Sequence, residues 1–179
     1  SRPTSAGRVG RRAATEIDAS GKAVAPGFIN VLSWANESLI ADGRAMSDLK
    51  QGVTLEIMGE GESGGPLNDA MKADILQRQG DIKYPVDWTT LGEFLDSLVR
   101  RGISLNVASF VGATSVRVYV LGEDDRDPTP AELARMQDLV RQAMREGALG
   151  VGSKQTYARA SFAKARELID LWKAAVEAW

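Results

Sequence analysis

The sequence predicts an α/β fold of about four βα units that build a parallel sheet. Apolar segments of strand length alternate along the chain with segments of helical periodicity, which is the pattern of βα units. Gly52, Gly102 and Gly147 each close a helical segment and lead directly into a strand, at intervals of about 45 to 50 residues,. A doubly wound sheet and part of a (β/α)8 barrel both satisfy this pattern.

Composition places the chain among ordinary globular proteins. Its 179 residues are 44% hydrophobic and 26% charged, which suits one domain with a sizeable core. A net charge of −2 provides no basic surface for nucleic acid or for an anionic membrane. No segment reaches the roughly twenty apolar residues of a membrane span. Cysteine is absent, which suits a cytoplasmic protein.

The absence of histidine restricts the chemistry further. Without imidazole, the chain lacks the usual general base near neutral pH and the commonest transition-metal ligand. A metal site would have to consist of carboxylates, amides and water. Ser33, Ser109 and Ser153 have no histidine to activate them, so a nucleophilic serine would need lysine as its base.

The N-terminal part of the chain divides into an arm and a first strand. Residues 1–15 are rich in Arg, Ser and Gly and show no hydrophobic period, so we expect a flexible arm. We expect residues 16–179 to form the domain itself. Residues 24–34 form an apolar run through the Pro26-Gly27 turn, which predicts a buried strand.

Periodicity and helix-end signals predict the remaining elements. Thr90 with Glu93, and Thr129 with Glu132, have the spacing of capping boxes that begin helices,. In chain order we expect helices over residues 37–51, 68–79, 90–101, 129–145 and 161–179, and strands over 53–58, 104–111 and 148–153. The last helix should bury one apolar stripe, made of Leu168, Ile169, Trp172, Val176 and Trp179,.

Three segments carry a resemblance to a known family. Residues 17–31, with Pro26-Gly27-Phe28-Ile29-Asn30 at their centre, are similar to the entry into the barrel of the amidohydrolases. Residues 121–126 and 147–153 resemble the N-acyl-D-amino-acid deacylases (D-aminoacylases) of that superfamily. The resemblance runs from about residue 16 to the C-terminus and implies about half of a (β/α)8 barrel. A whole barrel has about 250 residues, so a second copy or a missing barrel half should complete it.

The resemblance implies a function and also shows departures from it. The family removes the acyl group of N-acyl-D-amino acids with metal-activated water, the metal being zinc. Its first-strand motif Asp-Val-His-Thr-His is matched here by Asn30-Val31-Leu32-Ser33-Trp34, so Leu32 and Trp34 stand where histidines bind metal. Gly61 stands in the place of a metal-binding cysteine, and Ala113 in that of another histidine. We therefore expect this polypeptide alone to be inactive or nearly so.

Candidate site residues lie after the strands, where barrel enzymes place their active sites. Trp34, Ser153 and Tyr157 are candidates for binding an N-acyl amino acid or a related amide; a tyrosine near the place of Tyr157 contacts substrate in the family. Glu56 and Glu60 are candidate ligands for a divalent metal, since carboxylate oxygens suit Mg²⁺ or Ca²⁺. Glu62 could join them. Alternatively, Glu56 pairs with a lysine or arginine, and the two loop glutamates are solvated.

Two further features have weaker interpretations. The Gly59-Glu60-Gly61-Glu62-Ser63-Gly64 loop has the spacing of a dinucleotide-binding motif, but its carboxylates would repel a pyrophosphate. Lys154 lies where many amidohydrolases use a lysine to bridge two metals, yet a surface lysine is the better interpretation.

Two other functions remain open. One is a non-catalytic half-barrel for assembly or ligand binding, and the other is a histidine-free hydrolase with a carboxylate metal site.

Overall fold

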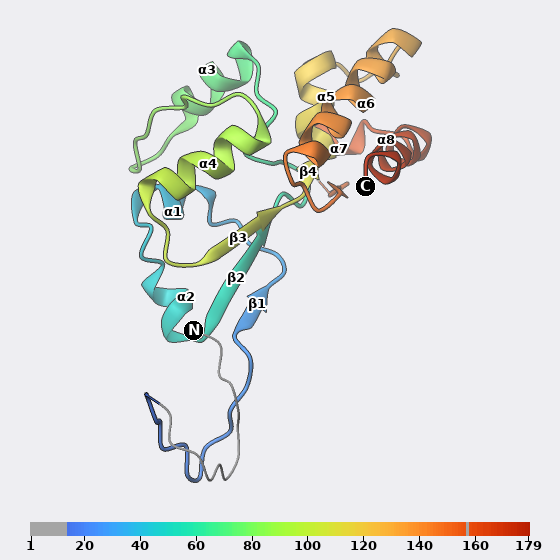
Figure 1. The fold of residues 1–179 in the computed structure, drawn as a ribbon. Coiled ribbons are helices and arrows are strands. Elements are labelled where there is room, and N and C mark those ends of the chain that lie inside the picture. Colours follow the sequence, from blue (N-terminus) through green and yellow to red (C-terminus); the bar gives the residue numbers. More distant parts are fainter. Residues whose placement is uncertain (1–13, 157) are drawn as a thin grey trace.

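The computed structural model of the chain describes residues 14–156 and 158–179, so most of the expected N-terminal arm lies outside the described residues. Strands β1 (Phe28–Asn30), β2 (Val53–Met58) and β3 (Asn106–Ser109) form one sheet in that order. Strands β4 (Val111–Gly112) and β5 (Val151–Gly152) form a second, two-stranded sheet. Figure 1 shows β1, β2 and β3 side by side, with β4 continuing the direction of β3.

The order of the strands distinguishes between the two architectures that the sequence allows. All three strand pairs are parallel, and each strand lies beside the one that precedes it along the barrel path. The expected strand over 104–111 is divided at Phe110: its first part pairs with β2 and its second part with β5. Sequential neighbours of this kind belong to a barrel rather than to a doubly wound sheet. The α/β prediction with parallel βα units is confirmed.

Helices that begin with a strong N-terminal signal form as predicted. The capping boxes are present at the start of α4 (Leu91–Arg101) and α6 (Pro130–Arg145), where Thr90 and Thr129 accept hydrogen bonds from the backbone N–H of Glu93 and Glu132. Helix α3 (Asp69–Arg78) begins after Asn68, whose side chain accepts from the backbone N–H of Met71.

The helix expected over 37–51 is instead two short helices, α1 (Asn36–Ala41) and α2 (Met46–Lys50). The break between them packs against the end of α4. A Cβ added at Gly43 would lie 2.3 Å from the carbonyl oxygen of Gly102, and the Gly43 carbonyl accepts a 2.8 Å hydrogen bond from Ser104. Because of this close approach, the chain turns at Gly43. The spacing of the apolar residues alone had favoured one continuous helix there.

Helix α5 (Ala113–Leu121) was not predicted. Its buried residues include the polar side chains of Thr114, Ser115 and Arg117. With polar and apolar side chains both buried, the sequence carries no apolar stripe that would mark a helix.

The stripe predicted for the last helix was wrong. That segment forms α7 (Ala158–Ser161) and α8 (Ala165–Glu177), and α8 buries Leu168, Leu171, Ala174 and Ala175. Of the predicted stripe, Leu168 alone is buried, whereas Ile169, Trp172, Val176 and Trp179 are exposed. Helix α8 therefore carries two apolar faces, of which one packs against α6.

The first strand is exposed, contrary to the prediction of a buried one. Phe28 and Ile29 point to opposite faces of β1 and are 60% and 54% exposed, so neither face is covered there. Among the described residues, β1 is an edge strand that pairs with β2 alone. The core lies between the strands and the helices and includes Leu39, Met58, Leu91, Phe94, Leu98, Val116, Met136, Val140 and Leu171. Residues 14–156 and 158–179 contain no helix whose length and hydropathy would allow it to cross a membrane.

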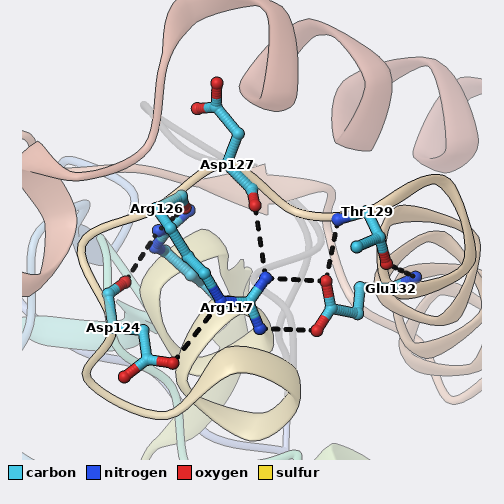
Figure 2. A network of polar contacts seen from close by, with 6 residues as sticks. All are labelled: Arg117, Asp124, Arg126, Asp127, Thr129 and Glu132. Carbon is cyan, nitrogen blue, oxygen red and sulfur yellow. Dashed lines mark hydrogen bonds and ion pairs between the residues drawn. The ribbon is translucent and has the colours of Figure 1, made fainter.

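Two arginines organise the loop between α5 and α6 (Figure 2). The guanidinium of Arg117, which is 1% exposed, donates to Glu167 at 2.6 Å and to the carbonyls of Asp124 and Arg126. Burial raises the pKa of Glu167, although the charge of Arg117 opposes this. Arg126 in turn makes two hydrogen bonds with the carboxylate of Glu132. The loop is thereby tied to α8 and to the start of α6.

Candidate functional site at the carboxyl ends of the strands

The segments that follow the strands converge on one region. The backbone N–H of Thr114, at the start of α5, donates to the carbonyl of Gly61 at 3.0 Å. Ser63 links the same two segments, since its N–H donates to Ser115 Oγ and its own hydroxyl accepts from the N–H of Gly112, both at 2.9 Å. These contacts hold the loop after β2 against the end of β4.

A lysine lies at the centre of this region. Lys154 Nζ is 3.0 Å from Glu60 Oε2 and 5.0 Å from the centroid of the Trp34 ring. The three residues follow β5, β2 and β1, respectively. The side chain of Lys154 is 25% exposed, so this lysine is partly buried yet still reaches solvent.

Gly61 makes room for this lysine. A Cβ built on Gly61 would lie 3.1 Å from the Cβ of Lys154, which is a tight contact. Gly61 also has φ +153, a conformation that side chains disfavour. The glycine and the lysine therefore fit one another.

An open pocket of about 610 Å³ borders the lysine. Its lining residues are Trp34, Gly61, Glu62, Arg78, Thr114, Lys154, Arg159 and Ala160. The two arginines are paired: Arg78 contacts Asp74, and Arg159 lies 2.6 Å from Glu123. The pocket thus offers an aromatic ring, a hydroxyl and balanced charges around an open space.

The three candidate metal ligands, Glu56, Glu60 and Glu62, lie in environments that differ from one another. The carboxylate of Glu56 accepts a 2.5 Å hydrogen bond from the hydroxyl of Ser33, and both side chains are buried. Side chains alternate along a strand, so Glu56 shares a face with Met58, which packs in the core formed with α4. Glu56 therefore faces the helices, whereas Glu60 pairs with Lys154 and Glu62 lines the pocket.

The predicted substrate-binding residues are described in part. Trp34 lines the pocket, Ser153 is half-buried directly after β5, and Tyr157 lies outside the described residues. Sequence analysis missed Arg78 and Arg159, which come from the end of α3 and from α7. No local pattern marks them, because only the fold brings these helices to the strand ends.

The residues at the strand ends do not fit a divalent metal. Leu32, Trp34 and Ala113 carry no ligand atoms in their side chains, and the carboxylate of Glu60 already contacts an ammonium group. Across residues 14–156 and 158–179, no three acidic side chains are grouped so that they could hold an ion.

Comparison with known proteins identifies the family. No protein-family profile matches the chain. The chain is 31% identical to a D-aminoacylase of Alcaligenes xylosoxydans xylosoxydans over 161 residues, which cover 88% of this chain and 32% of the relative. It is 33% identical to an N-acyl-D-aspartate deacylase of the same organism over 156 residues, covering 87% of this chain and 31% of the relative.

Solved structures agree with the sequence comparison. The zinc-bound N-acyl-D-glutamate deacylase of Bordetella bronchiseptica superimposes with a TM-score of 0.75 at 29% identity, over 89% of this chain and 34% of that structure. A D-aminoacylase that defines a subset of amidohydrolases gives a TM-score of 0.71 at 25% identity, over 86% and 32% of the two chains.

The fold is thus that of part of an amidohydrolase barrel. Within that class, the chain is a homologue of the D-aminoacylases and N-acyl-D-amino-acid deacylases, as the sequence resemblance predicted. It spans about a third of the length of the relatives that it matches.

Proposed function

We propose an amidohydrolase-type function in which the pocket at the strand ends receives an N-acyl amino acid or a related linear amide. The proposal rests on the pocket itself, which lies where barrel enzymes bind their substrates. Trp34 offers an apolar wall for an acyl chain, and Arg159 and Thr114 offer donors for carboxylate or amide oxygens. Ser153 and Tyr157 are proposed as further ligand contacts because of their place after β5.

We further propose that this polypeptide alone does not hydrolyse such a ligand. The support is chemical: hydrolysis in the family depends on metal-activated water, and the side chains at the strand ends do not provide a metal-binding donor set. No catalytic step is therefore assigned to the pocket. A cytoplasmic location is also proposed, from the absence of cysteine,.

An activity assay tests this proposal. The purified chain is incubated with N-acetyl-D-aspartate and N-acetyl-D-glutamate in the presence of zinc, and the released amino acid is quantified. We expect no turnover above the buffer blank, while a full-length N-acyl-D-aspartate deacylase and a full-length N-acyl-D-glutamate deacylase, assayed alongside, confirm the conditions. Saturation-transfer NMR with the same compounds should still detect binding, which Trp34→Ala should weaken. Zinc-dependent deacylation by the pure chain would contradict the proposal.

A second candidate function is a non-catalytic half-barrel that acts through assembly. The exposed apolar residues on β1 and on the outer face of α8 favour it, because apolar patches of this kind mark association surfaces. A homo-oligomer or a separate barrel half could cover them. Assembly without binding of N-acyl amino acids would favour this second function over the first.

A further inference from the structure

We propose that the ammonium group of Lys154 replaces a divalent metal as the fixed positive charge of this site. The solved neighbours include a D-aminoacylase with a binuclear metal centre and a deacylase complexed with zinc, and barrel enzymes carry such centres at the carboxyl ends of the strands. At that end of this barrel segment the described residues place a lysine. The inference does not depend on whether an N-acyl amino acid binds.

The position of the ammonium group is defined from two sides. Glu60 Oε2 lies 3.0 Å from Nζ, which is an ion-pair distance. The Trp34 ring lies on another side at 5.0 Å, within the range at which a cation is attracted to an aromatic face. A carboxylate and an electron-rich ring together stabilise one positive charge there.

The backbone also accommodates the lysine. Gly61 faces the Lys154 side chain so closely that any larger residue would meet the lysine Cβ at 3.1 Å. The loop after β2 therefore supplies no side chain at the point where the lysine emerges from β5. A metal-ligating side chain at position 61 would therefore begin in tight contact with Lys154.

Electrostatic repulsion by the ammonium group and the poor set of ligand atoms both disfavour a divalent ion beside Glu60. A divalent ion could bind Glu60 only by displacing the ammonium group of Lys154 from its carboxylate. If the ammonium group stayed nearby, it would repel the ion. Among the described residues that line the pocket, Glu62 is the acidic one, and two carboxylates without an imidazole or thiolate form a poor zinc site.

Removing the ammonium group should therefore allow a divalent ion to bind. We would titrate Mn²⁺ into ¹⁵N-labelled wild-type chain and into Lys154→Ala, and follow the paramagnetic broadening of the Trp34 indole N–H signal, assigned with Trp34→Phe. The wild type should need at least about tenfold more Mn²⁺ than the variant for equal broadening. The repulsion between Mn²⁺ and an ammonium group beside the carboxylate exceeds the free energy that corresponds to a tenfold change in affinity. Zinc analysis of dialysed wild-type protein should find no stoichiometric metal.

Three control variants locate the effect. Lys154→Arg keeps the charge and should behave like the wild type. Lys173→Ala removes a lysine that is 66% exposed on α8 and should also leave the titration unchanged. Adding Glu60→Gln to Lys154→Ala should abolish the gain in Mn²⁺ broadening. If circular dichroism shows that Lys154→Ala is unfolded, Lys154→Gln provides the same comparison.

Two results would overturn the inference. One is a wild-type chain that holds a stoichiometric divalent metal whose binding broadens or shifts the Trp34 signal. The other is a folded Lys154→Ala or Lys154→Gln protein that responds to Mn²⁺ no more strongly than the wild type.

Discussion

Individual carboxylates in this chain are held in their charged form by local partners. Hydrogen bonds from Arg126 lower the pKa of Glu132 far below its ordinary value, with help from Thr129. Backbone N–H groups of Thr90 and Thr89 lower the pKa of Glu93 in the same way. Both glutamates belong to capping boxes, so their ionisation is linked to the stability of the two best-defined helices.

The pH dependence of stability follows from the direction of these shifts. A carboxylate whose pKa is lower in the folded state stabilises the fold above its unfolded pKa, and this contribution is lost as the pH falls through the folded value. The urea midpoint, followed by circular dichroism, should therefore decrease steadily below about pH 4.5, the ordinary value for glutamate. Glu132→Gln and Arg126→Gln should each flatten that decrease. Unchanged pH profiles in both variants would show that the pair does not contribute.

The sequence predicts the capping pairs, but it does not predict the contacts of Lys154. Thr90 and Glu93 are three positions apart, so the backbone of one helical turn brings them together and the sequence predicts the contact. Lys154, Glu60 and Trp34 follow three different strands, so their contact depends on the sheet. The sequence predicted that strand ends would meet, but it could not predict which side chains would touch.

Among the elements, α8 shows best why periodicity alone is insufficient. Leu171 is fully buried, whereas Val176 is 76% exposed, although both belong to an apolar pattern at helical spacing. Apolar residues on two sides of a helix satisfy the same period, and the identity of the packed face depends on α6. Helix α5 was missed for the opposite reason. Its buried residues include polar side chains, so the sequence carries no apolar stripe that would mark a helix there.

The two faces of α8 should respond differently to truncation. Leu171→Ala should lower the free energy of unfolding by about 2 to 5 kcal/mol, since it opens a cavity in the core. Val176→Ala, on the same helix, should change it by no more than about 0.5 kcal/mol. Urea titrations of both variants provide the measurement. A larger loss for Val176→Ala than for Leu171→Ala would mean that the outer face is the packed one.

At the scale of the whole molecule, the exposed strand β1 and the outer face of α8 need a cover. The sequence predicted that a second copy or a missing barrel half should complete the barrel, but it did not predict which side chains would be exposed. Phe28, Ile29 and Val31 are each more than half exposed. Wherever the covering partner comes from, it should bury apolar area and satisfy the backbone edge of β1.

Sedimentation equilibrium of the pure chain tests whether a second copy can provide that cover. We expect a dimer or larger assembly at micromolar concentration. Phe28→Glu should weaken it, because the charge would be buried at the β1 edge. Leu76→Glu is a matched control, since Leu76 is 48% exposed on α3, away from both faces. A wild-type monomer would assign the cover to a different polypeptide segment.

The fit between Gly61 and Lys154 also makes this site difficult to reverse. A side chain restored at position 61 alone would meet the lysine and would adopt an unfavourable backbone conformation,. Replacing Lys154 first would free the Glu60 carboxylate, but the other strand ends would still supply no imidazole or thiolate for zinc. Several strand ends would therefore have to change together before a zinc centre could form here.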